Sequence, residues 1–270
     1  MLAGSGAAST DTVSEDVSAT LVFVTDFGLE DGYAAELRAA AWAVAPGVRC
    51  VDGTHMVPPG DVLTAMYRCK TLARTFGPGT VLCAVVDPGV GSDRDAVAVE
   101  CDSILCVAPD TGLVSYLWIE ASRRRAVRLE TPATASATFH GRDHFAPVAA
   151  RLAAGADLAE CGAPVSSPRL HEGVVPVAEG RLLRSQVVSV DHFGNCITGI
   201  RDRDAGSTQV AAVTWQGGST RHMVAAYAQI GTGLAALWNS AGHLEIAARE
   251  ASAGQVSGLS VGAPVAVELV

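Results

Sequence analysis

Residues 81–94 read VLCAVVDPGVGSDR, and this stretch says most about the fold. Its apolar run, Val81 to Val86, ends abruptly in Asp87-Pro88-Gly89, which predicts a buried strand that delivers a carboxylate to a tight loop at its carboxyl end. In open α/β sheets, ligands bind in the crevice outside those strand ends. The stretch therefore predicts an α/β sheet and the edge of that sheet where a site lies.

Three other segments place an Asp, His or Asn beside glycine: TDFG at 25–28, FHGRD at 139–143 and DHFGN at 191–195. Up to about residue 155, short apolar runs alternate with segments of helical spacing. Strands are expected at 21–24, 48–51, 81–86, 96–100 and 104–108, and helices at 33–45, 61–76, 112–120 and 146–154, with Asp61 as a possible N-cap. This alternation predicts an α/β fold whose central strands are mostly parallel.

The pattern changes after residue 155, where proline and glycine become frequent and helices fade. Short strands are expected at 185–190, 209–213, 223–226, 233–238 and 263–269, which favours a smaller β-barrel-like unit. The expected organisation is a disordered leader at 1–19, an N-terminal α/β domain at 20–165, a linker at 166–181 and a C-terminal β-barrel-like domain at 182–270.

Composition limits the classes of function. The chain has 270 residues, 49% of them apolar and 17% charged, with a net charge of −9. Such a chain is globular rather than disordered, and its negative charge disfavours nucleic acid but suits a cationic small molecule. The one basic run, at 123–125, is expected to be a solvated helix end.

The termini and cysteines indicate a compartment. We expect no secretory signal and no membrane-spanning segment, because no basic start with an apolar core follows Met1 and no apolar run is long enough. The seven cysteines form no Cys-x-x-Cys pair, so we expect core packing and a reducing cytoplasm.

Several polar residues could carry chemistry or serve the fold. Asp26 could accept hydrogen bonds from a ribose diol or cap a helix, and Asp31 could hold an ammonium group or cap the same helix. Asp87 and Arg94 flank a glycine-rich turn and could form a structural ion pair or a catalytic one. His140 could equally be structural.

The second half offers weaker candidates. Asn195 could read an adenine edge or stabilise its own turn, and Tyr227 could stack on a ring or belong to the core. Asp52 and His55 are spaced like metal ligands, but no third ligand has fitting spacing, so no metal and no cofactor is expected.

The four blocks, together with VDGTH at 51–55, PPGD at 58–61 and NSAGHLEI at 239–246, resemble the S-adenosylmethionine hydrolase (adenosine-forming) and halogenase superfamily, which includes fluorinase and chlorinase. The resemblance runs from about Leu21 to the C-terminus. It implies an N-terminal catalytic domain, a C-terminal adenosine-binding domain and a homotrimer with active sites at subunit interfaces.

The resemblance also implies roles for single residues. The catalytic group would be Asp87, Arg94 and His140. Asp26 would bind the ribose, and Asp31 and Asp191 the methionine amine. The remaining substrate-binding positions would be Asn195, Tyr227, Ser240, Glu245 and Ala248.

The implied reaction is hydrolysis of S-adenosyl-L-methionine to adenosine and L-methionine, by in-line attack of an activated water at C5′. The alternatives are a halide-dependent halogenase and a non-catalytic adenosine or S-adenosylmethionine sensor. Gly60, where halogenases carry Trp, and the intact group of Asp87 and His140 favour the hydrolase. Three departures from the family pattern lie elsewhere, at Asp95, Thr111 and Gly199.

Overall fold

A seven-stranded sheet organises the first half of the chain in the computed structural model, which describes residues 19–270. The predicted leader therefore lies, up to residue 18, outside the described residues. The strand order is β2-β1-β3-β5-β4-β6-β7. The elements are β1 (Thr20–Thr25), α1 (Tyr33–Val44), β2 (Arg49–Thr54), α2 (Val62–Phe76), β3 (Val81–Val85), β4 (Ala96–Cys101), β5 (Ile104–Pro109), α3 (Ser115–Glu120), β6 (Arg124–Leu129), a π-helical turn η1 (Gly141–Phe145), α4 (Ala146–Ala153), a 3₁₀ turn η2 (Leu158–Glu160) and β7 (Ala163–Val165).

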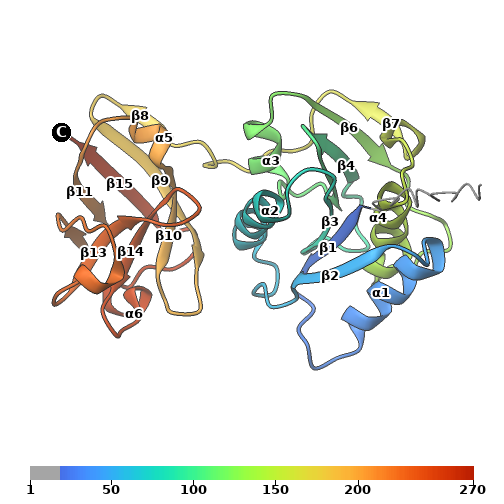
Figure 1. Cartoon of the computed structure of the whole chain (residues 1–270), viewed down its shortest axis with the longest axis horizontal. Coiled ribbons are helices and arrows are strands. Elements are labelled where there is room, and N and C mark those ends of the chain that lie inside the picture. Colours follow the sequence, from blue (N-terminus) through green and yellow to red (C-terminus); the bar gives the residue numbers. More distant parts are fainter. Residues whose placement is uncertain (1–18) are drawn as a thin grey trace, which may run out of the picture.

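The sheet is parallel where the expected site lies. The pairs β1–β2, β1–β3 and β3–β5 are parallel, whereas β4, β6 and β7 continue the sheet antiparallel. Helices α1 and α4 cover one face and α2 and α3 the other, as Figure 1 shows. The predicted α/β fold is thereby confirmed.

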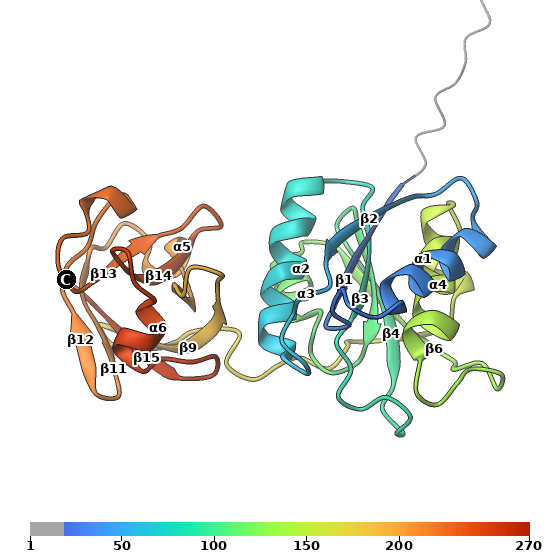
Figure 2. The same cartoon turned by 90° about the horizontal axis from the view of Figure 1, so that it is seen from below.

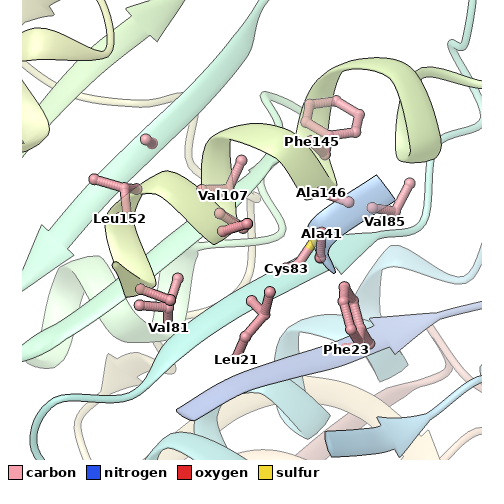
Figure 3. Packing of buried hydrophobic residues seen from close by; sticks show 14 of the residues in the cluster. Leu21, Phe23, Ala41, Val81, Cys83, Val85, Val107, Phe145, Ala146 and Leu152 are labelled. Atoms are coloured by element: carbon pink, nitrogen blue, oxygen red, sulfur yellow. The ribbon is translucent and has the colours of Figure 1, made fainter. Parts of the chain in front are cut away.

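The strands of the parallel part are buried on both faces, which explains their unbroken apolar sequence. On the α1–α4 face, Leu21, Phe23 and Cys83 pack against Phe145 and Leu152 (Figure 3). The polar residues that follow these strands, Asp26 after β1 and Asp87 after β3, lie just beyond this core. At its start, α2 is capped by Asp61, whose side chain accepts from Thr64 N, as expected.

The second half is a nearly closed barrel. Its path is β12-β11-β15-β9-β10-β14-β13, and β8 pairs with β9. The ends of the path meet through the segment after β12, since Ala236 N donates to His222 O and Val224 N donates to Ala236 O. The elements are β8 (Val177–Glu179), β9 (Leu182–Val190), β10 (Cys196–Arg201), α5 (Asp202–Ala205), β11 (Val210–Trp215), β12 (Gly218–Thr220), a 3₁₀ turn η3 (Tyr227–Gln229), β13 (Leu234–Trp238), β14 (His243–Ala248), α6 (Ala253–Ser257) and β15 (Pro264–Leu269).

The two halves meet where α2 and α3 face the barrel (Figures 1 and 2). The contact is polar as well as apolar. Lys70 Nζ lies 2.9 Å from Glu120 Oε1 and 2.8 Å from His243 Nε2, and the Glu120 carboxylate also faces Arg201 and Arg203. Burial, followed by the charge of Lys70, lowers the pKa of His243 to about 4.

Two expectations fail locally. Residues 124 and 125 begin β6 rather than ending a helix, since α3 stops at Glu120 and residues 121–123 form a short connection. Residues 223–226 form only an isolated bridge from Met223 to Ala236. Strand β8 lies inside the predicted linker 166–181, and we keep the limits 20–165 and 182–270 as a proposal.

Within residues 19–270, no helix has the length and apolar character needed to cross a bilayer. Over the same range no group of three His, Cys, Asp or Glu side chains is arranged to hold a metal ion. All seven cysteines are free thiols.

Candidate active site

Asp87 lies immediately beyond the carboxyl end of β3, at the start of a loop that turns back on it. Gly89 N donates to Asp87 Oδ1 at 3.2 Å, and Val90 N donates to its carbonyl. The loop returns through Gly91, whose φ is +76° and where any side chain would meet Ala137 O at 2.6 Å. This tight packing brings Arg94 back over Asp87.

Arg94 and Asp87 form a fork-shaped ion pair. Arg94 Nε donates to Oδ1 at 2.9 Å and to Oδ2 at 3.0 Å, and Nη2 also donates to Oδ2. The two side chains are only 10% and 6% exposed. The several parallel hydrogen bonds and the low exposure fix the orientation of the two side chains more firmly than a single exposed salt bridge would.

His140 completes the group from the start of η1. Arg94 Nη2 lies 2.8 Å from His140 Nδ1. Because a guanidinium has no acceptor, Nδ1 must accept this hydrogen bond, so the ring is neutral and its proton sits on Nε2. Burial, followed by the positive charge of Arg94, lowers the pKa of His140 and favours the same neutral form.

Asp26 is held nearby, at the carboxyl end of β1. Its Oδ2 accepts from Gly60 N at 2.8 Å. Burial raises the pKa of Asp26, and the negative charge of Asp87 raises it further, although the bond from Gly60 acts in the opposite direction. The turn of His140 approaches closely because residue 141 is glycine, where a side chain would meet the Phe27 ring at 2.9 Å. Four predicted residues thus converge at one sheet edge.

Asp31 makes no hydrogen bond or ion pair with this group among the described residues. It is exposed in the turn before α1, and neither it nor Asp26 caps that helix, whose N-cap is Gly32 without a side-chain bond. The capping alternative is therefore wrong for both residues.

Four predicted residues of the barrel line one cavity of about 580 Å³: Asp191, Asn195, Tyr227 and Ala248. Asp191 organises the turn, since its Oδ1 accepts from Asn195 N and its Oδ2 from Asn195 Nδ2, each at 2.9 Å. Glu245 lies beneath this cavity and accepts from Tyr227 Oη at 2.7 Å. Burial raises the pKa of Glu245.

Ser240 is not part of this cavity. It is exposed and lines a separate groove with residues of α2, including Tyr67 and Arg68. Sequence reasoning missed Asn239, which donates to Glu245 Oε2 at 3.2 Å and to Tyr67 Oη at 3.3 Å. The conspicuous NSAGHLEI block contained it, but nothing in the spacing indicated that it would reach Glu245.

The two groups of residues are each bordered by exposed apolar side chains. Leu29 and Met56 are 68% and 66% exposed near the first group, and Phe193 and Tyr227 are 75% and 50% exposed at the second. The cavity at Asn195 is lined by barrel residues alone. Each group therefore resembles part of a site rather than a finished one.

None of the three departures from the family pattern is a member of the group of Asp87, Arg94 and His140. Asp95 is exposed before β4, and Thr111 carries a buried hydroxyl without a partner among the described residues. Gly199 lies in β10, where a Cβ would lie 2.4 Å from Ser185 Oγ and 3.4 Å from Tyr116 Oη of α3.

Known proteins resemble both halves of this chain. The chain matches the SAM hydroxide adenosyltransferase N-terminal domain over residues 21–162 and the C-terminal domain over residues 185–266. It is 37% identical to an (R)-S-adenosyl-L-methionine hydrolase of Thermus thermophilus over 256 residues, covering 90% of this chain and 97% of that protein. A protein of the same name from Salinispora arenicola is 43% identical over 186 residues, 64% of this chain and 69% of the other.

More distant relatives include a fluorinase of Actinoplanes sp., 26% identical over 215 residues, which is 68% of this chain and 72% of that protein. Among solved structures, an uncharacterised conserved protein of Thermotoga maritima superposes with a TM-score of 0.82 at 31% identity, covering 92% of this chain and 99% of that one.

Proposed function

This chain belongs to the SAM hydroxide adenosyltransferase family, and on that premise we propose that it hydrolyses S-adenosyl-L-methionine to adenosine and L-methionine. The hydrolases among its relatives are more similar to it than the fluorinases are. The single observation that carries the chemistry is the buried group in which Arg94 donates to both Asp87 and His140.

The reaction needs no general acid, but it needs a well-oriented nucleophile. The sulfonium leaves as a neutral thioether, so no leaving group needs a proton. Water must be held in line with the C5′–S bond and opposite the sulfur. One proton is released overall when water replaces methionine at C5′.

We assign that proton to Asp87. Arg94 already donates to His140 Nδ1, so the ring has no free acceptor, whereas a carboxylate keeps lone pairs beyond those that Arg94 occupies. His140 can then orient the water by donating from Nε2. Arg94 Nη1, buried and without a partner among the described residues, is a second donor that can hold the water oxygen.

The substrate's binding groups divide between the halves. Asp26 would hold the ribose diol and Asp31 and Asp191 the methionine amine. The adenosine end would lie against Asn195, Tyr227, Glu245 and Ala248. The exposed side chains around both groups support a homotrimer whose sites combine the first half of one chain with the barrel of its neighbour.

We also propose that the enzyme works in the cytoplasm, because seven free thiols suit a reducing compartment. A halogenase remains the alternative chemistry, with fluorinases among the relatives. The negative charge of Asp87 disfavours it, since a carboxylate beside the nucleophile would repel halide.

Product analysis tests the proposal. Purified protein incubated with S-adenosyl-L-methionine in ¹⁸O-water should release adenosine and methionine in equal amounts, with the label in the 5′-hydroxyl, and a chelator should change nothing. A 5′-halo-5′-deoxyadenosine as the main product in the presence of chloride, or no turnover, would overturn it.

A further inference from the structure

Four polar side chains form a chain across the ends of β1 and β2 that the proposed reaction does not use. From α1 inward they are Arg38, Asp52, His55 and Thr25. Asp52 and His55 drew attention in the sequence as a pair spaced like metal ligands. The structure gives them other partners.

The inner link joins the tips of two neighbouring parallel strands. Thr25 Oγ1 lies 2.7 Å from His55 Nδ1, and the residues are 0% and 2% exposed. Thr25 Oγ1 also accepts from Phe27 N at 3.2 Å. One threonine hydroxyl therefore connects the histidine to the backbone on the far side of Asp26.

The outer link orients the histidine ring. His55 Nε2 lies 3.2 Å from Asp52 Oδ1, too poorly aligned for a good hydrogen bond but close enough for electrostatic attraction. Because a carboxylate can only accept, the nitrogen that faces it is the one that carries a proton, and in the tautomer protonated at Nε2 the Nδ1 atom accepts from Thr25. Arg38 donates to the other oxygen of Asp52, where a metal ion would compete with its positive charge.

Backbone bonds extend the link to the Asp26 loop. Gly28 N donates to His55 O at 2.8 Å, and Val57 N donates to Thr25 O at 3.2 Å. Asp26 lies between these bonds, with one oxygen bonded to Gly60 N. The position of its other oxygen is thus set by how firmly the tips of β1 and β2 are joined.

We infer that His55, acting through Thr25, is a positioning residue that aims the Asp26 carboxylate at the vicinal hydroxyls of a ribose. Two hydroxyls on neighbouring carbons need a carboxylate at one angle, whereas a single hydroxyl tolerates a looser one. The link thereby determines selectivity for a ribonucleoside over a deoxyribonucleoside. This inference rests on the proposed function, in which Asp26 holds the ribose.

The test compares two ligands by calorimetry, adenosine and 2′-deoxyadenosine, on the full-length protein. Thr25→Val removes the hydroxyl at nearly constant volume, and His55→Phe removes the acceptor while keeping a ring. In each variant the affinity for adenosine should fall roughly tenfold. This is the size expected when one hydrogen bond between a ribose hydroxyl and the charged Asp26 carboxylate is lost. Affinity for 2′-deoxyadenosine should fall less than about twofold, and the double variant should lose no more than either single one.

Controls separate failure of this inference from failure of the proposed function. Exposed His222, on the barrel, serves as the matched histidine, and His222→Phe should bind both ligands normally. Asp26→Ala should abolish the preference for adenosine. If it does, while Thr25→Val weakens both ligands equally or neither, His55 is only structural and the inference is wrong. If Asp26→Ala keeps the preference, the ribose assignment itself fails, and the inference fails with it.

Discussion

The sheet edge around Asp87 and the barrel cavity around Asn195 differ in how their charged side chains are partnered. Within the group of Asp87, Arg94 and His140 the charges are balanced, because Arg94 neutralises Asp87 and donates to an uncharged His140. At the barrel the acidic groups Asp191 and Glu245 have no cation beside them among their described partners. The first arrangement fixes a nucleophile, and the second is suited to a cationic ligand.

The largest effect on activity is expected when the charge of Asp87 is removed. Asp87→Asn keeps the shape but loses the proton acceptor, so kcat should fall about 10²–10⁴-fold with little change in KM. Steady-state kinetics with S-adenosyl-L-methionine measure both. Asp93→Asn, an exposed change in the same loop, should leave both within about twofold. A raised KM with normal kcat in Asp87→Asn would make Asp87 a binding residue.

The sequence predicted the sheet edge better than the barrel, for a physical reason. Asp26 and Asp87 follow apolar strands directly, and parallel strands bring their carboxyl ends to one edge, so local pattern was enough. The barrel residues meet through pairing of β10 with β14, which links positions about fifty residues apart. The position of Ser240 outside the barrel cavity could not be predicted, because its block predicts a hairpin without indicating which side chains face the cavity.

The same limit explains the smaller errors. Strand β6 begins with exposed arginines, which read as a solvated helix end. Residues 223–226 have strand composition but close the barrel through a single bridge. The junction between Lys70, Glu120 and His243 carried no sequence signal, because its members are separated by up to 173 residues.

Acid should weaken that junction and the sheet edge together. Burial, as the largest cause, lowers the pKa of His243 to about 4, from 6.5. It does the same for His144, which lies in η1 with its ring 6.3 Å from that of His140. Below pH 6.5 the unfolded chain binds protons that the folded chain refuses, so the free energy of unfolding falls with pH until about pH 4 and then levels. At about 1.4 kcal/mol per pKa unit, each histidine accounts for up to roughly 3 kcal/mol.

Denaturant titrations at several pH values check this expectation. Because Lys70 donates to His243 Nε2, His243→Gln should reduce the acid dependence by about the contribution of one histidine. An unchanged slope between pH 6.5 and 4 in this variant would show that His243 is not buried as a neutral ring at the junction.

A smaller effect should come from the barrel. Tyr227→Phe removes the hydroxyl that donates to Glu245 Oε1. The Glu245 carboxylate then faces the ligand without this hydrogen bond. KM should rise about tenfold, since a bond to a charged group is lost, while kcat stays within about twofold. Tyr116→Phe is the control, because that hydroxyl has no partner among the described residues. Loss of kcat in Tyr227→Phe would contradict the division between recognition and chemistry.

The smallest effect is expected at Ser240. Because it lies outside the barrel cavity, Ser240→Ala should change KM less than about twofold, whereas Asn195→Ala should raise it. Comparing the two variants under identical conditions sharpens the boundary of the adenosine site. Equal increases in KM for the two variants would show that Ser240 belongs to the adenosine site, as the family resemblance implied.

Complementation tests most directly whether the two regions of one site come from two chains. Asp87→Asn and the double variant Asn195→Ala, Tyr227→Ala should each be nearly inactive at low substrate concentration. Co-expressed in equal amounts, they should recover about a quarter of wild-type activity, because about one site in four then pairs an intact first half with a neighbour's intact barrel. If the mixture is no more active than its two parents, each site is built within a single chain and the shared-site account is wrong.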